Sequence, residues 1–174
     1  MSGRHVLNDI DQAIAETHDV TVADLSDELL AADQPLVVRG RAADWPAVRH
    51  GRESTDGLID YLPGFDSGNV VTALFAPAEA DGRIFYNDDM TAFNFEYRRR
   101  ALRDAVQQVR SHMNLPSPPS LYIGSTNVDH WLPGFREEND FPIQHLAPLV
   151  SVWIGNQSRV SAHYDFPSNI ACVV

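Results

Sequence analysis

The sequence predicts an α+β fold in which short helices and a few strands precede a sheet. Apolar residues recur at helical spacing in several segments before residue 114. Runs rich in Val, Ile and aromatic residues dominate after residue 120, where helical spacing is lost. The 174 residues are 44% hydrophobic and 21% charged, which is enough apolar surface for the core of about one domain.

Helices dominate the first half of the chain. Thr21 and Asp24 can cap a helix, and prolines favour helix starts at Asp44-Trp45-Pro46 and a stop after residue 113. Leu102, Val106 and Val109 share one face of the longest helix. The elements predicted here are a helix over 21–32, a short buried strand over 36–38, a helical turn from 44, a helix over 54–62, a strand over 69–75, its partner strand over 82–86, and a helix over 96–113.

The second half is predicted to be all-β. Strands are expected over 121–123, 150–154, 159–164 and 170–174. The last strand is apolar on both faces and is followed by no polar tail. We therefore expect one domain over 1–174, with an N-terminal α+β region over 1–119 and the first strands of a core sheet over 120–174, and we expect that sheet to be incomplete at residue 174.

Charge and composition exclude several classes of function. The chain has 24 acidic residues against 13 basic ones, all of them Arg, for a net charge of −11. A nucleic-acid partner is not expected, and the run Arg98-Arg99-Arg100 is interpreted as a solvated helix face. The sequence has no P-loop, G-x-S-x-G or C-x-x-C motif. A single cysteine and the lack of a long apolar run predict a cytoplasmic protein without a membrane partner.

The main candidate for a functional site is the pair His163 and Asp165, at the end of a predicted strand. Residues two apart on a strand share a face, so an imidazole and a carboxylate can occupy adjacent positions on one metal ion. Nitrogen and oxygen ligands suit Fe(II), Mn or Zn, and a second histidine would complete a two-histidine, one-carboxylate triad. Because an H-x-D motif arises readily by chance at this composition, the motif alone is weak evidence for a metal site. The evidence for that site comes from the predicted strands on either side of the motif.

Other conspicuous residues are expected to be structural. A turn is predicted over 87–89, a surface loop with a core tryptophan over 129–131, a partly buried histidine at His145, and core positions at Phe93, Phe95 and Cys172.

The segments 153–156, 161–165 and 169–174 together resemble the cupin-like branch of the Jumonji C oxygenases, the group that contains the asparagine hydroxylase factor-inhibiting HIF. Further matches lie upstream in the right order. They are Pro35 to Gly40 with Asp44-Trp45-Pro46, the run 85–95, which is similar to bacterial members, and Tyr122-Ile123-Gly124 leading to Trp131-Leu132-Pro133-Gly134-Phe135.

The resemblance implies an iron- and 2-oxoglutarate-dependent oxygenase on a double-stranded β-helix. His163 and Asp165 match the first two iron ligands. Tyr122 matches a tyrosine that reaches the far carboxylate of 2-oxoglutarate, and Asn169 an asparagine near the cosubstrate. Val160 stands where the family often has Thr or Ser, so Ser161 is the nearest candidate for that role. In the family, the second iron histidine and the basic residue that pairs with 2-oxoglutarate come later than position 174.

The expected partners are therefore 2-oxoglutarate, dioxygen and a protein or peptide substrate, with a homodimer left open. Two alternatives remain. One is a non-catalytic cupin-like binding or scaffold module, and the other is a cupin that uses a different divalent metal on a small molecule.

Overall fold

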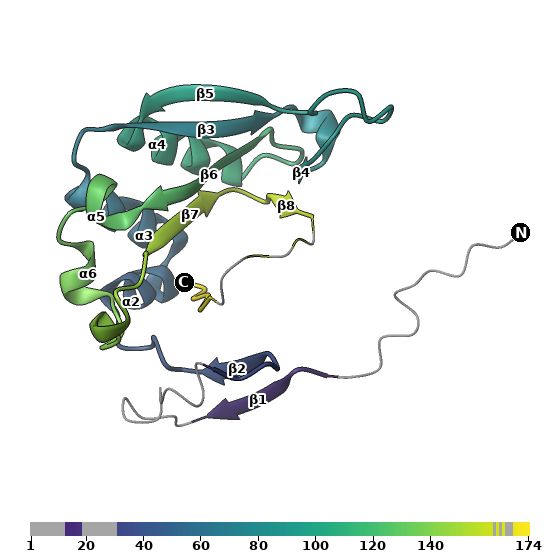
Figure 1. The fold of residues 1–174 in the computed structure, drawn as a ribbon. Coiled ribbons are helices and arrows are strands. Elements are labelled where there is room, and N and C mark those ends of the chain that lie inside the picture. The colour runs from purple at the N-terminus through teal and green to yellow at the C-terminus, as the bar shows by residue number, and fades with distance from the viewer. Residues whose placement is uncertain (1–12, 19–30, 162, 164, 166–168) are drawn as a thin grey trace, which may run out of the picture.

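A four-stranded antiparallel sheet is the centre of the fold in the computed structural model, which describes residues 13–18, 31–161, 163, 165 and 169–174 (Figure 1). The strands are β3 (Val70–Ala76), β5 (Glu96–Ala101), β6 (Ser120–Asn127) and β7 (Ser151–Gly155), in the order β5-β3-β6-β7. The sheet thus combines strands from both sides of residue 120. The predicted α+β class is confirmed.

The two faces of the sheet differ in what covers them. Helix α4 (Leu102–Met113) packs on one face, where Val71 and Ala73 of β3 and Leu121 and Ile123 of β6 are fully buried. The opposite face, called the open face below, carries Tyr97, Leu74 and Tyr122 in one cross-strand row. Since side chains alternate along a strand, burial of one set leaves the other set on the open face.

Strand β6 contains a β-bulge. Ile123 pairs with Ile154 and Thr126 with Val152, so β6 advances three residues while β7 advances two. Gly124 and Ser125 together therefore lie opposite Trp153.

Short helices pack at the end of the sheet around a buried asparagine. They are α2 (Pro46–Glu53), α3 (Thr55–Tyr61), η3 (Leu62–Phe65), α5 (Val128–Trp131) and α6 (Phe135–Glu138). Pro46 occupies the first turn of α2, and the Ser54 hydroxyl accepts a 2.9 Å hydrogen bond from the Gly57 amide to cap α3. Asn139 accepts from the Ala47 amide at 2.9 Å and donates to the Tyr61 hydroxyl at 2.8 Å, which joins α2, α3 and the end of α6.

Two small parallel pairs flank the main sheet. Strand β1 (Ala15–His18) pairs with β2 (Leu36–Arg39), and Glu16 and Arg39 form an ion pair of 2.7 Å across them. Strand β4 (Arg83–Ile84) pairs with β8 (Arg159–Val160). Two 3₁₀ turns, η4 (Ala78–Ala80) and η5 (Gln144–Leu146), complete the elements. No helix in the described part of the chain is long and apolar enough to cross a membrane.

The helix predicted over 96–113 is wrong for its first six residues, which form β5. The apolar helical periodicity begins only at Leu102, so nothing in 96–101 required a helix. On the strand, Arg98 and Arg100 point toward the α4 side, where the Arg98 guanidinium lies over the Phe75 ring and Arg100 hydrogen-bonds Gln108. The interpretation of 98–100 as a solvated helix face is therefore also wrong.

The predicted pairing of 69–75 with 82–86 is wrong as well. Strand β3 pairs with β5 and β6, while β4 pairs with β8 across a long sequence separation. Of the described residues in the strand expected over 159–164, only those of β8 form a strand. No strand forms over 170–174, because no described strand lies beside this segment to accept its hydrogen bonds. Strand β2 is present but only half-buried, since it belongs to the two-stranded pair.

Several smaller predictions also have outcomes. The turn over 87–89 is confirmed, and the strands at 69–75 and 150–154 and the helices near 46 and 55 are confirmed within a residue or two. The strand at 121–123 is confirmed but extends four residues further, to Asn127. The segment 129–131 is helical rather than a loop. Phe93, His145 and Cys172 are exposed, against the expectation of core or partly buried positions. The helix expected over 21–32 lies almost entirely outside the described residues.

Candidate functional site

The chain approaches the predicted site through a turn anchored at Asn156. This residue is 3% exposed. Its side-chain carbonyl accepts from the Leu121 amide at 2.8 Å, and its amide group donates to the Pro119 carbonyl at 3.0 Å. The turn after β7 is thereby tied to the first residues of β6, and β8 is directed away from the sheet.

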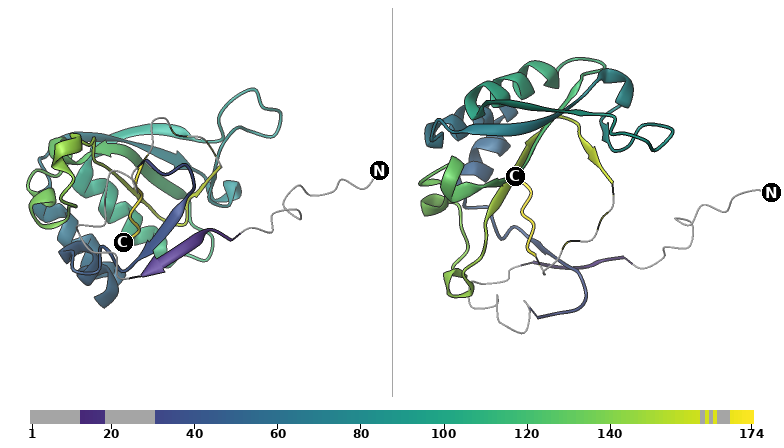
Figure 2. Two further views of the ribbon diagram at one scale, coloured as in Figure 1. Left: turned by 60° about the horizontal axis from the view of Figure 1, so that its bottom comes forward. Right: turned by 45° about the horizontal axis from the view of Figure 1, so that its top comes forward.

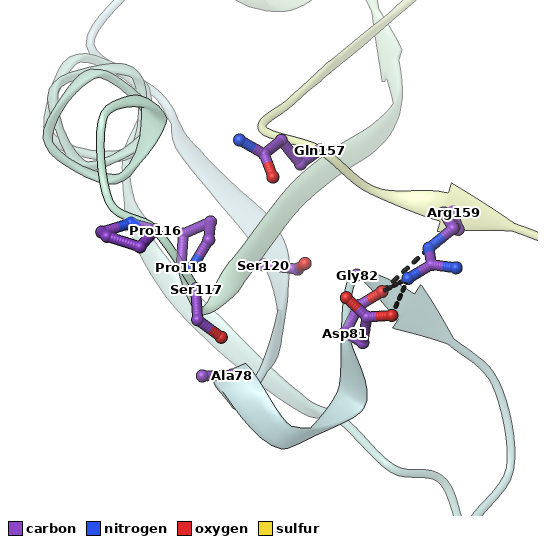
Figure 3. A pocket seen from close by; sticks show the side chains of 9 residues that line it. All are labelled: Ala78, Asp81, Gly82, Pro116, Ser117, Pro118, Ser120, Gln157 and Arg159. Atoms are coloured by element: carbon purple, nitrogen blue, oxygen red, sulfur yellow. Dashed lines mark hydrogen bonds and ion pairs between the residues drawn. The ribbon is translucent and has the colours of Figure 1, made fainter.

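Strand β8 is then held against β4. The Arg159 amide donates to the Gly82 carbonyl at 2.7 Å, and the Arg159 guanidinium binds both the carbonyl and the carboxylate of Asp81. Figure 3 shows these contacts beside a polar pocket of about 230 Å³, into whose wall the buried Ser120 is built. None of the predicted site residues lines this pocket. The pocket lies beside the start of β8, and the candidate site lies further along the chain.

His163 and Asp165 lie together just past β8, and neither residue belongs to a helix or strand. His163 Nε2 is 3.4 Å from Asp165 Oδ1, and the two side chains are 59% and 58% exposed. This separation is compatible with adjacent positions on one metal ion, as the sequence predicts for the two residues.

The neighbouring residues orient this pair. His163 Nδ1 is 2.9 Å from the Ser161 carbonyl oxygen, which can only accept, so Nδ1 carries the proton and Nε2 presents a lone pair when the ring is neutral. The Asn169 amide donates to Asp165 Oδ2 at 3.0 Å, which leaves Oδ1 toward His163. The structure thus brings Ser161 and Asn169 to the pair, Ser161 through its backbone carbonyl.

Tyr122 lies on the open face of the sheet, half-buried, and feels the charge of Asp165. Burial raises the pKa of the Tyr122 phenol above its usual value, and the Asp165 carboxylate raises it further. The phenol is therefore protonated at neutral pH and can donate a hydrogen bond. Tyr122, which the resemblance assigns to 2-oxoglutarate binding, is thus close enough to Asp165 for that carboxylate to affect its pKa.

Two glycines make room for the Tyr122 ring. A Cβ placed on Gly155, directly opposite in β7, would lie 3.3 Å from the ring, and one on Gly124 would lie 2.9 Å from it. The Gly124 Cβ would also overlap the Trp153 indole, so both aromatic rings lie against the bare backbone of Gly124. Trp153 is 57% exposed on the same open face. We call the bare backbone of Gly124 and Gly155 the glycine bed. The spacing Tyr122-x-Gly124, which puts a glycine beside the tyrosine on one strand face, is the sequence signal for it.

His163 Nε2 and Asp165 Oδ1 are suited to occupy two coordination positions of one divalent cation. A neutral imidazole lone pair and a carboxylate oxygen 3.4 Å apart repel unless a proton or a cation lies between them. With bonds of roughly 2.0–2.2 Å, adjacent ligands on one metal stand about 3.0–3.5 Å apart. A histidine whose other ring nitrogen donates to a carbonyl is typical of metal ligands. Within the described residues, no third His, Cys, Asp or Glu joins the pair.

Comparison with protein families matches the cupin-like domain over residues 22–174. The chain belongs to the cupin-like domain family. The match spans the sheet, the helices at its end and the His163–Asp165 segment of this cupin-like domain. No curated protein matches the chain significantly. The family is of the Jumonji C type, which agrees with the coarser part of the resemblance found in the sequence.

Proposed function

We propose that this cupin-like domain is the metal-binding part of an Fe(II)- and 2-oxoglutarate-dependent oxygenase. The observation that carries the proposal is the approach of His163 Nε2 to Asp165 Oδ1, with Nδ1 held by the Ser161 carbonyl. The pair supplies one nitrogen and one oxygen from positions 163 and 165, as the first two ligands of a facial triad do. Membership of the cupin-like family supports the same assignment.

Each residue of the site has a role in the proposed reaction. His163 and Asp165 would hold iron, which with 2-oxoglutarate and dioxygen supplies the oxidising power to hydroxylate a C–H bond while 2-oxoglutarate becomes succinate and CO2. Tyr122, protonated because of its raised pKa, would donate a hydrogen bond from its phenolic O–H to a cosubstrate carboxylate. Asn169 keeps the Asp165 carboxylate in one orientation, so the metal-facing oxygen does not rotate away.

The resemblance to the factor-inhibiting-HIF type gives the finer form of the proposal. The substrate is a protein or peptide side chain, and the core is a double-stranded β-helix to which β3, β6 and β7 contribute. The protein is proposed to act in the cytoplasm.

Anaerobic binding of Fe(II) and 2-oxoglutarate to the full chain tests this function. We expect His163→Ala and Asp165→Ala each to weaken iron binding by at least about tenfold, because each removes a direct ligand. His130→Ala, at an exposed histidine of α5, is the matched control and should bind as wild type. Binding of neither iron nor 2-oxoglutarate by the wild-type protein would overturn the oxygenase and favour a cupin-like binding module. Binding of another divalent metal without 2-oxoglutarate would favour a different metal-dependent cupin.

A further inference from the structure

The connection between β4 and β5 projects from the end of the sheet (Figures 1 and 2). It carries a series of aromatic side chains. Successive ring centroids lie 5.3, 5.0, 4.8 and 5.5 Å apart along the series Phe85, Tyr86, Phe93, Phe95 and Tyr97. We call residues 85–97 the aromatic hairpin. Its rings contact one another, in stacked, tilted and edge-to-face arrangements, rather than entering the core beneath α4.

Much of this aromatic surface is in solvent. Tyr86, Phe93 and Tyr97 are 42%, 49% and 63% exposed, and Met90 at the tip is 58% exposed. A groove of about 390 Å³ runs beside Phe93 and Phe95, between them and Phe75 of β3. Grouped exposed aromatics of this kind mark interaction surfaces, because single exposed apolar residues are normal but contiguous ones are costly.

The aromatic hairpin is rigid before any partner arrives. The Asn87 carboxamide oxygen accepts from the amides of Thr91 and Ala92 at 3.0 and 3.1 Å. Asn94 accepts from the Phe85 amide at 2.9 Å and donates to the Arg83 carbonyl at 2.8 Å. A pre-formed surface loses little conformational entropy on binding, which favours its use as a recognition element.

At the base of the hairpin, the acidic residues are paired: Glu96 pairs with Arg98, and Asp81 pairs with Arg159. Arg83 lies over the Phe85 ring at 4.5 Å, and Arg98 lies over the Phe75 ring at 3.4 Å. Two rings at the base therefore already hold a guanidinium group.

The tip of the hairpin is acidic. Residues 86–95 contain Asp88 and Asp89 and no basic residue. Asp88 makes no contact with the described residues that would neutralise its charge.

We infer that the aromatic hairpin is a docking surface for an arginine-rich basic segment of another protein. Guanidinium groups would lie over the exposed faces of Phe93 and Tyr97, as Arg98 lies over Phe75, with Asp88 and its neighbours supplying opposite charge. A second copy of this chain is a poor occupant because it too carries a net charge of −11. Polyanions are repelled for the same reason.

The base of the hairpin is joined to the strand that precedes the candidate metal site through the β4–β8 pair. Ile84, directly before the hairpin, pairs with Val160, three residues before His163. A segment bound on the hairpin would thus be presented near that site. The docking itself needs neither metal nor cosubstrate, so it goes beyond the proposed function and is tested separately from it.

Fluorescence anisotropy of a labelled peptide of six Gly-Arg repeats, titrated with the metal-free full chain, tests the inference. We expect saturable binding that weakens with added salt and that exceeds binding of a matched Gly-Glu peptide. Phe93→Ala with Tyr97→Ala should weaken binding about five- to thirtyfold, the value of two exposed cation–π contacts. Phe93→Leu, which keeps the apolar volume but removes the ring face, should weaken it in the same direction. Leu149→Ala, at an exposed apolar residue elsewhere, should not.

Charge reversal separates local from overall attraction. Asp88→Lys and Glu53→Lys change the net charge equally, but Glu53 ends α2 on another part of the molecule. We expect Asp88→Lys to weaken peptide binding at least about fivefold and Glu53→Lys less than about twofold, because exposed charges beyond about 10 Å are screened. Equal effects of the two reversals, or unchanged binding by the double aromatic variant, would overturn the docking surface whatever the outcome for iron.

Discussion

Replacement of Gly82 by Ala tests how the base of the candidate site is held. Gly82 has a φ of +80°, and a Cβ placed there would lie 2.3 Å from the Gln157 carbonyl oxygen. That oxygen is backbone and cannot move aside alone, so β8 must shift away from β4. The shift weakens the 2.7 Å bond from the Arg159 amide to the Gly82 carbonyl.

The expected cost has two parts. The left-handed backbone costs a residue with a Cβ about 1–2 kcal/mol. The overlap with Gln157 and the weakened β4–β8 pairing add about 2 kcal/mol, the usual cost of forcing extra volume into a packed site. Gly68 provides the control, since its φ of +77° is similar and a Cβ there meets nothing within 4 Å. Gly68→Ala should therefore show the backbone cost alone.

Urea unfolding followed by tryptophan fluorescence measures the difference. We expect the free energy of unfolding of Gly82→Ala to lie about 2 kcal/mol below that of Gly68→Ala, with equal dependence on urea. If the proposed iron site is correct, Gly82→Ala should also weaken Fe(II) binding, because β8 leads to His163 within three residues. A difference in unfolding free energy below about 0.5 kcal/mol would refute the reasoning.

Three further predictions concern the open face and the helix cluster. Because the fold stabilises the protonated phenol, the stability that Tyr122 contributes should be complete below its ordinary pKa of about 10, and it should be lost as pH rises through the higher pKa of the folded protein. Asp165→Asn should lower the pKa of Tyr122 in the folded protein. That pKa is measured from the phenolate absorbance that is present in the protein and absent from Tyr122→Phe. An unchanged pKa of Tyr122 in Asp165→Asn would show that the two residues do not interact. Gly124→Ala should displace the Trp153 ring and shift its fluorescence emission with a loss of about 1–3 kcal/mol in unfolding free energy, and an unaltered spectrum would contradict the glycine bed. Asn139→Ala should lower the unfolding free energy by about 2–4 kcal/mol, because it leaves buried donors and acceptors without partners, and a loss under about 1 kcal/mol would count against that accounting.

The sequence predicted the parts of the fold that depend on local pattern. Helix starts were found because Pro46 and Ser54 each favour a helix start within the first turn. Strands β3 and β6 were found because their segments are rich in β-branched and aromatic residues. The pairing of β4 with β8 could not be predicted, because it joins residues 76 positions apart in short strands without a distinctive pattern. Strand β5 was missed because its arginines, which suit an exposed helix, instead alternate between the Phe75 ring on one face and solvent on the other.

In the candidate site too, features set by local spacing could be predicted and features set by the folded structure could not. The spacing of His163 and Asp165 was sufficient to predict that they approach, since a gap of one residue limits their separation. The role of the Ser161 carbonyl was not predictable, because any residue at that position supplies a carbonyl. The bed beneath Tyr122 depends on Gly155 in another strand, and so on a register that only the folded sheet defines.

The bulge in β6 bears on how this strand can vary in length. Ile123 and Thr126 both face the α4 side although they are three residues apart, because Gly124 and Ser125 share the place opposite Trp153. Removal of Ser125 would convert the bulge into a regular ladder and leave both buried residues where they are. Removal of a residue from the regular part of β6 would instead turn the rest of the strand over and exchange its buried and open faces. Length variants of this strand should therefore be confined to the bulge.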